Sequence, residues 1–341
     1  MAAPVVSSVS PSQGPLAGGT TVTVTGTGFT GATAVQFGSS AAASFTVLSS
    51  TQISAVTPAG SGTVNVAVTT SQGTSTQSVS YTYVAAPSVS SLAPGQGPTS
   101  GGTSVTLTGT GFTGAGAVRF DATPAASFAV FSATRIIAVT PVHPAGAAAV
   151  TVTTPGGTSS PDDPNTYFYY AALPSLTDVA PPSGASAGGT LTTLTGNGLV
   201  GATAVRFDTT PAASFTVVSA TQITAVTPAH AAGAAAVTVT TPGGTSNPVS
   251  YVYLDAPTLV SLAPDRGPTY AGTAVTLTGT NLAATTGVRF GTTAASFTVL
   301  SPTSITAVAP TGAAGAVAVT VLTPAGVSNG LTYTRFAGPA V

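Results

Sequence analysis

The sequence predicts an all-β protein made of four tandem copies of one small β-sandwich domain. Three observations support this: short segments in which Val and Thr alternate, 40 Gly and 27 Pro that supply turns, and a fourfold internal repeat. An apolar-Pro start recurs at Pro4, Pro87, Pro174 and Pro257, so the periods are 83, 87 and 83 residues. Long helices are not expected, because no ten-residue stretch has helical apolar spacing without Gly, Pro or Thr runs.

Each repeat begins with a Gly-rich turn that leads into an alternating strand. In the first repeat the turn is Gly14-Pro15…Gly18-Gly19-Thr20 and the strand is Thr21-Val22-Thr23-Val24-Thr25. The Val side chains should point inward and the Thr side chains outward. The third repeat has Thr192 at an inward position, so a looser core is predicted there.

A Gly-flanked corner and a short strand follow, and then four further strand segments. Apolar residues two apart are predicted to point inward, with the residue between them outward; the pairs are Val35/Phe37, Val118/Phe120, Val205/Phe207 and Val288/Phe290. Further strands are expected near residues 45–47, 53–55, 64–68 and 79–83, with Gly73 marking the last hairpin. Seven short strands in about 80 residues are typical of an immunoglobulin-like sandwich. Without Cys or Trp, rows of Phe and Tyr must form the core.

The repeated motif resembles the IPT/TIG domain, the immunoglobulin-like module of plexins, some transcription factors and many bacterial surface proteins. The motif runs Pro-x-x-Gly-Pro-x-x-Gly-Gly-Thr, alternating Val/Thr, Thr-Gly-x-Gly-Phe and Val-x-Phe-Gly. It covers essentially the whole chain, as repeats 1–85, 86–172, 173–255 and 256–341. The resemblance implies early-set immunoglobulin sandwiches in a surface, adhesive or carbohydrate-associated context, and it transfers no catalytic residue. Departures are Asn281-Leu282 at the corner, and Asp121 and Asp208 where the first repeat has Gly38.

The linkers between repeats are short. Tyr83-Val84-Ala85-Ala86-Pro87 leads from one repeat into the next, and residues 253–257 do the same between the third and fourth. Because Pro fixes its own φ and extends its predecessor, successive domains should be restrained end to end. The sequence therefore predicts β-sandwiches arranged as a rod, on the order of 150 Å long.

Charge and composition exclude several classes of function. Charged residues make up 4% of the chain, with no Lys or Glu and a net charge of −1, so no basic face for nucleic acid is expected. Zero Cys excludes disulfides and thiolate sites. The sequence contains no run of about 18 consecutive apolar residues, so no membrane insertion is predicted. An extracellular or cell-surface location is predicted, and the export route is left open because the N-terminus lacks signal-peptide features.

Two histidines and one acidic pair are candidate metal ligands. His143 and His230 occupy the same loop in the second and third repeats, and each is interpreted as an ordinary exposed loop histidine because each repeat offers only one. Asp162-Asp163 lies between prolines and is interpreted as a solvated turn. The alternative is a calcium site completed by Asp178 or backbone carbonyls. No metal site and no cofactor are predicted.

Two further carboxylates are candidate catalytic groups. Asp121 and Asp208 could form a glycosidase pair, but each lies beside an arginine, Arg119 or Arg206, which favours a local surface ion pair. No Ser-His-Asp order with a nucleophile elbow occurs, and no Gly-rich loop leads into a helix. No catalytic residue is therefore predicted, and the protein is not expected to be an enzyme.

These features favour a non-enzymatic structural protein: an extended surface spacer, an adhesin stalk or a self-assembling fibre subunit. The alternatives are a glycan-binding module array accessory to a secreted enzyme, or a virion or tail-fibre component. An exposed aromatic platform would favour glycan binding, and Tyr270, in the turn of the fourth repeat, is the one extra aromatic residue that could contribute to it. Outward Thr and Ser rows can carry O-glycans or bind sugars, but Thr also simply suits an exposed strand. The first repeat has no charged side chain, which predicts self-association through uncharged strand edges.

Overall fold

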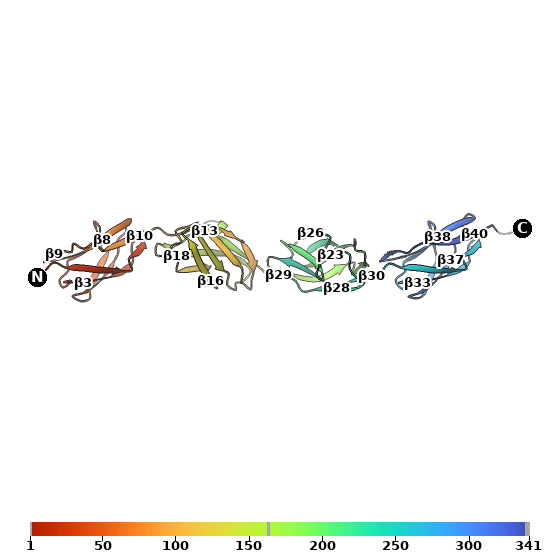
Figure 1. The fold of residues 1–341 in the computed structure, drawn as a ribbon, viewed down its shortest axis with the longest axis horizontal. Helices are drawn as coiled ribbons and strands as arrows, with labels where there is room; N and C mark the ends of the chain where they lie inside the picture. The colour runs from red at the N-terminus through yellow and green to blue at the C-terminus, as the bar shows by residue number, and fades with distance from the viewer. Residues whose placement is uncertain (1, 162–163, 338–341) are drawn as a thin grey trace. The chain divides into compact units, whose positions relative to one another are not determined.

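The computed structural model describes residues 2–161 and 164–337, and each repeat in it is a pair of packed β-sheets (Figure 1). The chain divides into two compact units, residues 1–172 and 173–341, each holding two repeats. Within the described residues every repeat has ten strands, in a four-stranded and a six-stranded sheet. The all-β, immunoglobulin-like prediction is confirmed. Asp162 and Asp163 lie outside the described residues.

The strands of the first unit follow the same order in both of its repeats. The first repeat's four-stranded sheet consists of β1 (Val5–Ser10), β3 (Thr21–Thr27), β7 (Gln52–Val56) and β6 (Ser44–Val47). Its other sheet consists of β2 (Gln13–Pro15), β10 (Ser80–Val84), β8 (Gly62–Thr70), β4 (Ala34–Phe37) and β5 (Ser40–Ala41), with β9 (Gly73–Thr74) paired to β8. The second repeat's four-stranded sheet consists of β11 (Ser88–Ala93), β13 (Ser104–Thr110), β17 (Arg135–Val139) and β16 (Ser127–Ser132). Its other sheet consists of β12 (Gln96–Pro98), β20 (Tyr167–Ala171), β18 (Gly146–Thr154), β14 (Ala117–Phe120) and β15 (Thr123–Pro124), with β19 (Gly157–Thr158) paired to β18.

The second unit repeats this arrangement. The third repeat's four-stranded sheet consists of β21 (Ser175–Ala180), β23 (Leu191–Asn197), β27 (Gln222–Val226) and β26 (Ser214–Ser219). Its other sheet consists of β22 (Ser183–Ala185), β30 (Val249–Leu254), β28 (Gly233–Thr241), β24 (Ala204–Phe207) and β25 (Thr210–Pro211), with β29 (Gly244–Thr245) paired to β28. The fourth repeat's four-stranded sheet consists of β31 (Thr258–Ala263), β33 (Ala274–Thr280), β37 (Ser304–Val308) and β36 (Phe297–Ser301). Its other sheet consists of β32 (Arg266–Pro268), β40 (Leu331–Phe336), β38 (Gly315–Thr323), β34 (Gly287–Phe290) and β35 (Thr293–Ala295), with β39 (Gly326–Val327) paired to β38.

Strand alternation places the side chains as the sequence predicts. Val22 and Val24 on β3 are fully buried, while the Thr residues between and beside them are more exposed. On β14, Val118 and Phe120 are buried and Arg119 points outward. This follows from the two-residue period of a strand, which sends alternate side chains to opposite faces of the sheet.

Each repeat closes its own aromatic core. In the first repeat the Tyr81 ring lies edge-on to Phe37 and to Tyr83, at centroid distances of 5.4 and 5.0 Å. In the second, Phe168 has the same arrangement with Phe120 and Tyr170. Edge-to-face packing of this kind adds about 0.5–1.5 kcal/mol per pair beyond area burial. The Phe and Tyr rows therefore form the cores, as predicted.

The third repeat keeps its inward threonine. Thr192 is fully buried on β23, and its hydroxyl donates a 2.9 Å hydrogen bond to the Ala225 carbonyl oxygen on β27. The corresponding residues in the other repeats are apolar: Val22, Val105 and Val275. The inward position is confirmed, and the buried hydroxyl is satisfied rather than left without a partner.

The second repeat differs where its last strand begins. In the third and fourth repeats, an Asn side chain bonds the backbone beside a bulge in the first strand; Asn247, for example, accepts from the Leu176 N–H and donates to the Leu176 carbonyl. In the second repeat a short 3-10 helix, η1 (Pro164–Thr166), lies against β11. This helix leads directly into β20.

Candidate binding face

Two aspartates occupy a backbone conformation that usually requires glycine. The φ angles of Asp121 and Asp208 are 50° and 52°, close to the 60° of Gly38 and the 65° of Gly291 at the corresponding positions. Asp tolerates this left-handed region better than most residues. The second and third repeats thereby place a carboxylate at the end of β14 and β24, where the first and fourth place none.

The two histidines also replace glycines. The backbone N–H of His143 donates to the Thr99 carbonyl oxygen at 3.0 Å, and the N–H of Gly60 and Gly312 make the equivalent bonds in the first and fourth repeats. The repeats therefore fall into two types. The first and fourth have a Gly/Gly pair at these two positions, and the second and third have an Asp/His pair.

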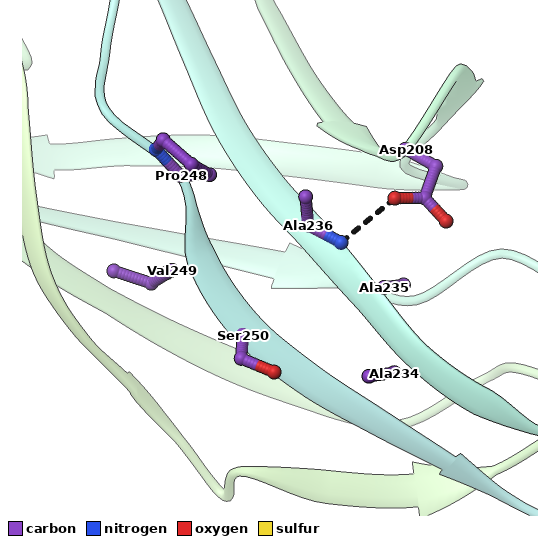
Figure 2. A pocket seen from close by; sticks show the side chains of 7 residues that line it. All are labelled: Asp208, Ala234, Ala235, Ala236, Pro248, Val249 and Ser250. Atoms are coloured by element: carbon purple, nitrogen blue, oxygen red, sulfur yellow. Dashed lines mark hydrogen bonds between the residues drawn. The ribbon is translucent and has the colours of Figure 1, made fainter.

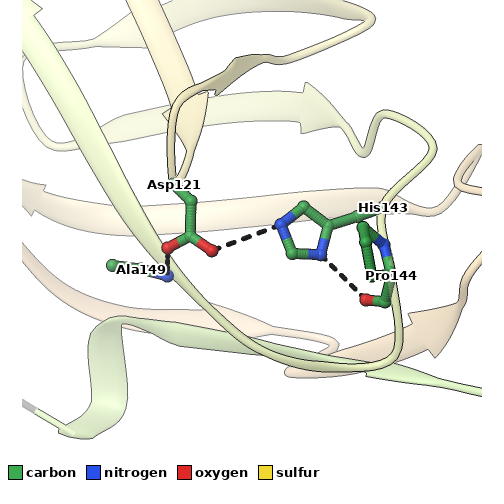
Figure 3. A network of polar contacts seen from close by, with 4 residues as sticks. All are labelled: Asp121, His143, Pro144 and Ala149. Atoms are coloured by element: carbon green, nitrogen blue, oxygen red, sulfur yellow. Dashed lines mark hydrogen bonds and ion pairs between the residues drawn. The ribbon is translucent and has the colours of Figure 1, made fainter.

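In the second repeat the Asp/His pair forms a network (Figure 3). Asp121 Oδ2 lies 3.2 Å from His143 Nε2, and Asp121 Oδ1 accepts a 2.8 Å bond from the Ala149 N–H. His143 Nδ1 lies 2.9 Å from the Pro144 carbonyl oxygen. Both ring nitrogens of His143 therefore lie within hydrogen-bonding distance of an oxygen atom. The third repeat has the same contacts between His230, Asp208 and Ala236.

Each histidine ring also covers a core tyrosine. The His143 ring is stacked on Tyr170 with centroids 4.6 Å apart, and His230 is stacked on Tyr253 at 4.7 Å. Burial, with a contribution from the nearby Asp121 carboxylate, raises the pKa of Tyr170 to about 12. Burial, with contributions from Tyr251 and Asp208, raises the pKa of Tyr253 to about 12. Each network therefore links a carboxylate at the end of β14 or β24 to the aromatic core of its repeat.

Two sequence predictions are wrong at this site. The histidines are not ordinary exposed loop residues, because the side chain of His143 is only 14% exposed and that of His230 only 20%. The predicted ion pairs of Asp121 with Arg119 and of Asp208 with Arg206 do not form. The two arginines donate instead to the carbonyl oxygens of Ala122 and Thr209. The cause is the left-handed aspartate, whose carboxylate is directed across the sheet at the next strand.

Beside Asp208, the outer face of the third repeat's six-stranded sheet is hollowed. The hollow has a volume of about 410 Å³ and is open to solvent; it is lined by Asp208, Ala234, Ala235, Ala236, Pro248, Val249 and Ser250 (Figure 2). Small side chains on β28 and β30 leave this space. Asp208 is the single carboxylate in the lining, so the arrangement can accept hydrogen bonds from a ligand but offers no acid–base pair.

Across residues 2–161 and 164–337, no three His, Asp or Glu side chains are grouped as metal ligands. Asp178 lies exposed on β21. Asp121 and Asp208 are each engaged by a histidine of their own repeat.

The sequence analysis missed two outward aromatic residues, Tyr167 and Tyr169 on β20. Their neighbours Phe168 and Tyr170 are buried in the core, whereas Tyr169 is 53% exposed and Tyr167 is half-buried. The signal was present: four consecutive aromatic residues in a strand must place two on each face. Tyr270, which the sequence did indicate, is 66% exposed.

The fold defines a tandem array of immunoglobulin-like sandwiches with an aromatic core in each repeat. An IPT/TIG domain matches the chain four times, at residues 4–83, 87–169, 174–253 and 257–335, and the chain belongs to this family. Domains of this family are in general non-catalytic.

The chain is also similar to individual proteins. Fibrocystin-L of Mus musculus is 37% identical over 112 residues, which is 32% of this chain and 3% of that protein, so the chain spans a small part of that relative. Among solved structures, the extracellular region of plexin A4 is 20% identical, with 97% of this chain and 30% of that chain covered and a TM-score of 0.37. Invasin, a bacterial integrin-binding protein, is 18% identical, with 98% and 79% covered and a TM-score of 0.29.

Proposed function

We propose that this protein is a non-enzymatic spacer that holds a binding partner at a distance from a surface, as an adhesin stalk or a fibre subunit. The observation that carries this proposal is that each repeat buries its own separate core. Domains that are complete in themselves and joined by short Pro-containing linkers can be added in series to extend reach. The four repeats have boundaries at 1–85, 86–172, 173–255 and 256–341 in this proposal.

Small-angle scattering of the full chain tests the spacer role. The expected maximum dimension is on the order of 150 Å, against roughly 40–60 Å for one compact domain of this length. A matched variant carries a ten-residue Gly/Ser insert between Ala85 and Ala86, which should broaden the distance distribution because the restraint of the linker is lost. A compact profile for the natural chain, or an insert without effect, contradicts the proposal.

The proposed location is extracellular or at a cell surface, with a second copy, another surface protein or a glycan as partner. Among the described residues, no helix has the length and apolarity to cross a membrane. Nucleic acid is not a proposed partner, because six arginines distributed over the second to fourth repeats provide no phosphate-binding surface. Retention on DNA that decreases steeply with salt would contradict this part of the proposal.

A further inference from the structure

We propose that the outer face of the six-stranded sheet in the second repeat binds a neutral polysaccharide. The binding face consists of Tyr167 and Tyr169 on β20, Ala147 and Ala149 on β18, Gln96 on β12, and Asp121 at the end of β14. The inference goes beyond the spacer role and does not depend on it, since a spacer needs no ligand of its own.

The strand register arranges these residues in two rows. Tyr169 pairs with Ala147 on one side and with Gln96 on the other. Tyr167 pairs with Ala149, whose N–H donates to the Asp121 carboxylate. The two tyrosines are two residues apart on one strand, about 6.8 Å. Two rings therefore stand along one side of a shallow floor of alanines, with a fixed carboxylate on the other side.

This arrangement fits the two chemical faces of a sugar ring. The axial C–H groups of a pyranose form an apolar face that packs on the electron-rich face of an aromatic ring. Its hydroxyls must find hydrogen-bond partners, which the Gln96 amide and the remaining lone pairs of Asp121 can supply. The network with His143 holds Asp121 in place before a ligand arrives, which lowers the cost of ordering it.

Charge favours a neutral ligand over an anionic one. Asp121 is the acidic group in the face, and Arg119 is the nearest cation on β14, already donating to the Ala122 carbonyl oxygen. None of the six residues that make up the binding face is a cation, so an anionic group of a carboxylated or sulfated polymer seated on it would meet the Asp121 carboxylate without a positive charge from the face itself to balance it. A polymer of neutral hexose or pentose units meets no such repulsion.

The aromatic pair is confined to this repeat. The corresponding outward residues are Ser80 and Thr82 in the first repeat, Ser250 and Val252 in the third, and Thr332 and Thr334 in the fourth. The third repeat has the same aspartate and alanines but small residues beside them, and it shows an open hollow there. The general fold therefore does not require tyrosines at these two positions.

Native affinity electrophoresis of the full chain tests the inference. The gels contain one of four neutral polysaccharides: hydroxyethylcellulose, arabinoxylan, galactomannan or dextran. At least one should retard the natural protein, and the double variant Tyr167→Ser/Tyr169→Val should bind it at least about tenfold more weakly, a loss of about 1.4 kcal/mol. This variant installs the residues of the third repeat, so it should fold, and circular dichroism checks that it does.

Tyr270→Ser is the matched control, because it removes an exposed ring from another repeat and should leave retardation unchanged. The inference is overturned if none of the four polymers retards the natural protein, or if the double variant is retarded equally. A further gel contains alginate, which is anionic, and retardation by alginate alone also overturns the inference. Light scattering measures self-association of the natural protein and the double variant. If the double variant self-associates less but binds polysaccharide as the natural protein does, the inference is also overturned and the face is a contact between copies.

Discussion

Asp121 and His143, which contact each other, stand where the first repeat has Gly38 and Gly60. The variants Asp121→Gly and His143→Gly install the residues of the first and fourth repeats, so both should fold. We expect a double-mutant cycle to give a coupling energy of about 0.5–1 kcal/mol, because the Asp121 side chain is 45% exposed to solvent although His143 is largely buried. Denaturation of residues 86–172 measures it. A coupling energy near zero would mean that the two residues act independently.

Tyr170 and Tyr253 give the protein an alkaline limit. Their pKa values are raised from about 10 to about 12 on folding, mainly by burial. The folded state therefore holds the phenolic protons more tightly, so this stability is fully present below pH 10 and is lost as the pH rises through 12. In a pH titration, the tyrosinate absorbance of these two rings should appear at a higher pH than that of the exposed tyrosines and should coincide with unfolding. Early, reversible titration of all nine tyrosines in the folded protein would contradict this.

Arg335 is the charged residue that the core of the fourth repeat encloses. It is 5% exposed, and it stands on β40 where the other repeats have Tyr83, Tyr170 and Tyr253. One guanidinium nitrogen donates to the Pro310 carbonyl oxygen at 3.1 Å, while its Nε has no partner among the described residues.

In the first repeat the Tyr83 hydroxyl makes the corresponding bond to the Pro58 carbonyl oxygen. Arg335→Tyr should therefore stabilise residues 256–341 by about 1–3 kcal/mol, because it replaces a buried charge with a group that fits. Urea denaturation measures the change, and Arg289→Tyr on the exposed face is the control. A destabilised Arg335→Tyr variant would show that the buried guanidinium has a stabilising partner.

At the scale of the strand, β23 and β13 differ at one inward position, Thr192 against Val105. Thr192→Val should stabilise the third repeat by about 1 kcal/mol, since a buried methyl replaces a hydroxyl whose bond gains little net energy. Val105→Thr should destabilise the second repeat by a similar amount. Thermal unfolding of the separate repeats checks both. If Thr192→Val is destabilising, the predicted looseness of the third core is wrong.

At the scale of the whole molecule, the first repeat should drive association. It has no charged side chain, and its sheets end in the edge strands β1, β6, β2 and β5. Leu48, just beyond β6, is 58% exposed. Edges without charge are open to pairing with another chain.

Light scattering over a wide concentration range should show residues 1–85 associating well before residues 173–255, and the full chain forming ordered oligomers or fibres. The more charged third repeat serves as the matched control. If residues 1–85 and the full chain both stay monomeric at millimolar concentration, assembly is excluded and a monomeric spacer remains.

The sequence by itself determined the repeats, the strands and the inward residues such as Val22 and Phe120. These depend on local rules, namely the two-residue period of a strand and the turn preferences of Gly and Pro. The outward positions of Tyr167 and Tyr169 follow from the same period and were within reach of sequence analysis.

Only the tertiary structure decided the partners of the polar groups. Asp121 lies two residues from Arg119 but bonds across the sheet to His143 and Ala149, because its left-handed backbone turns the carboxylate that way. Arg335 follows the buried Tyr333 by two residues on β40 and is itself buried, at a position where the other repeats have tyrosine, and its guanidinium donates to the Pro310 carbonyl oxygen. In both cases the deciding contact joins residues more than twenty positions apart, which local sequence preference does not encode.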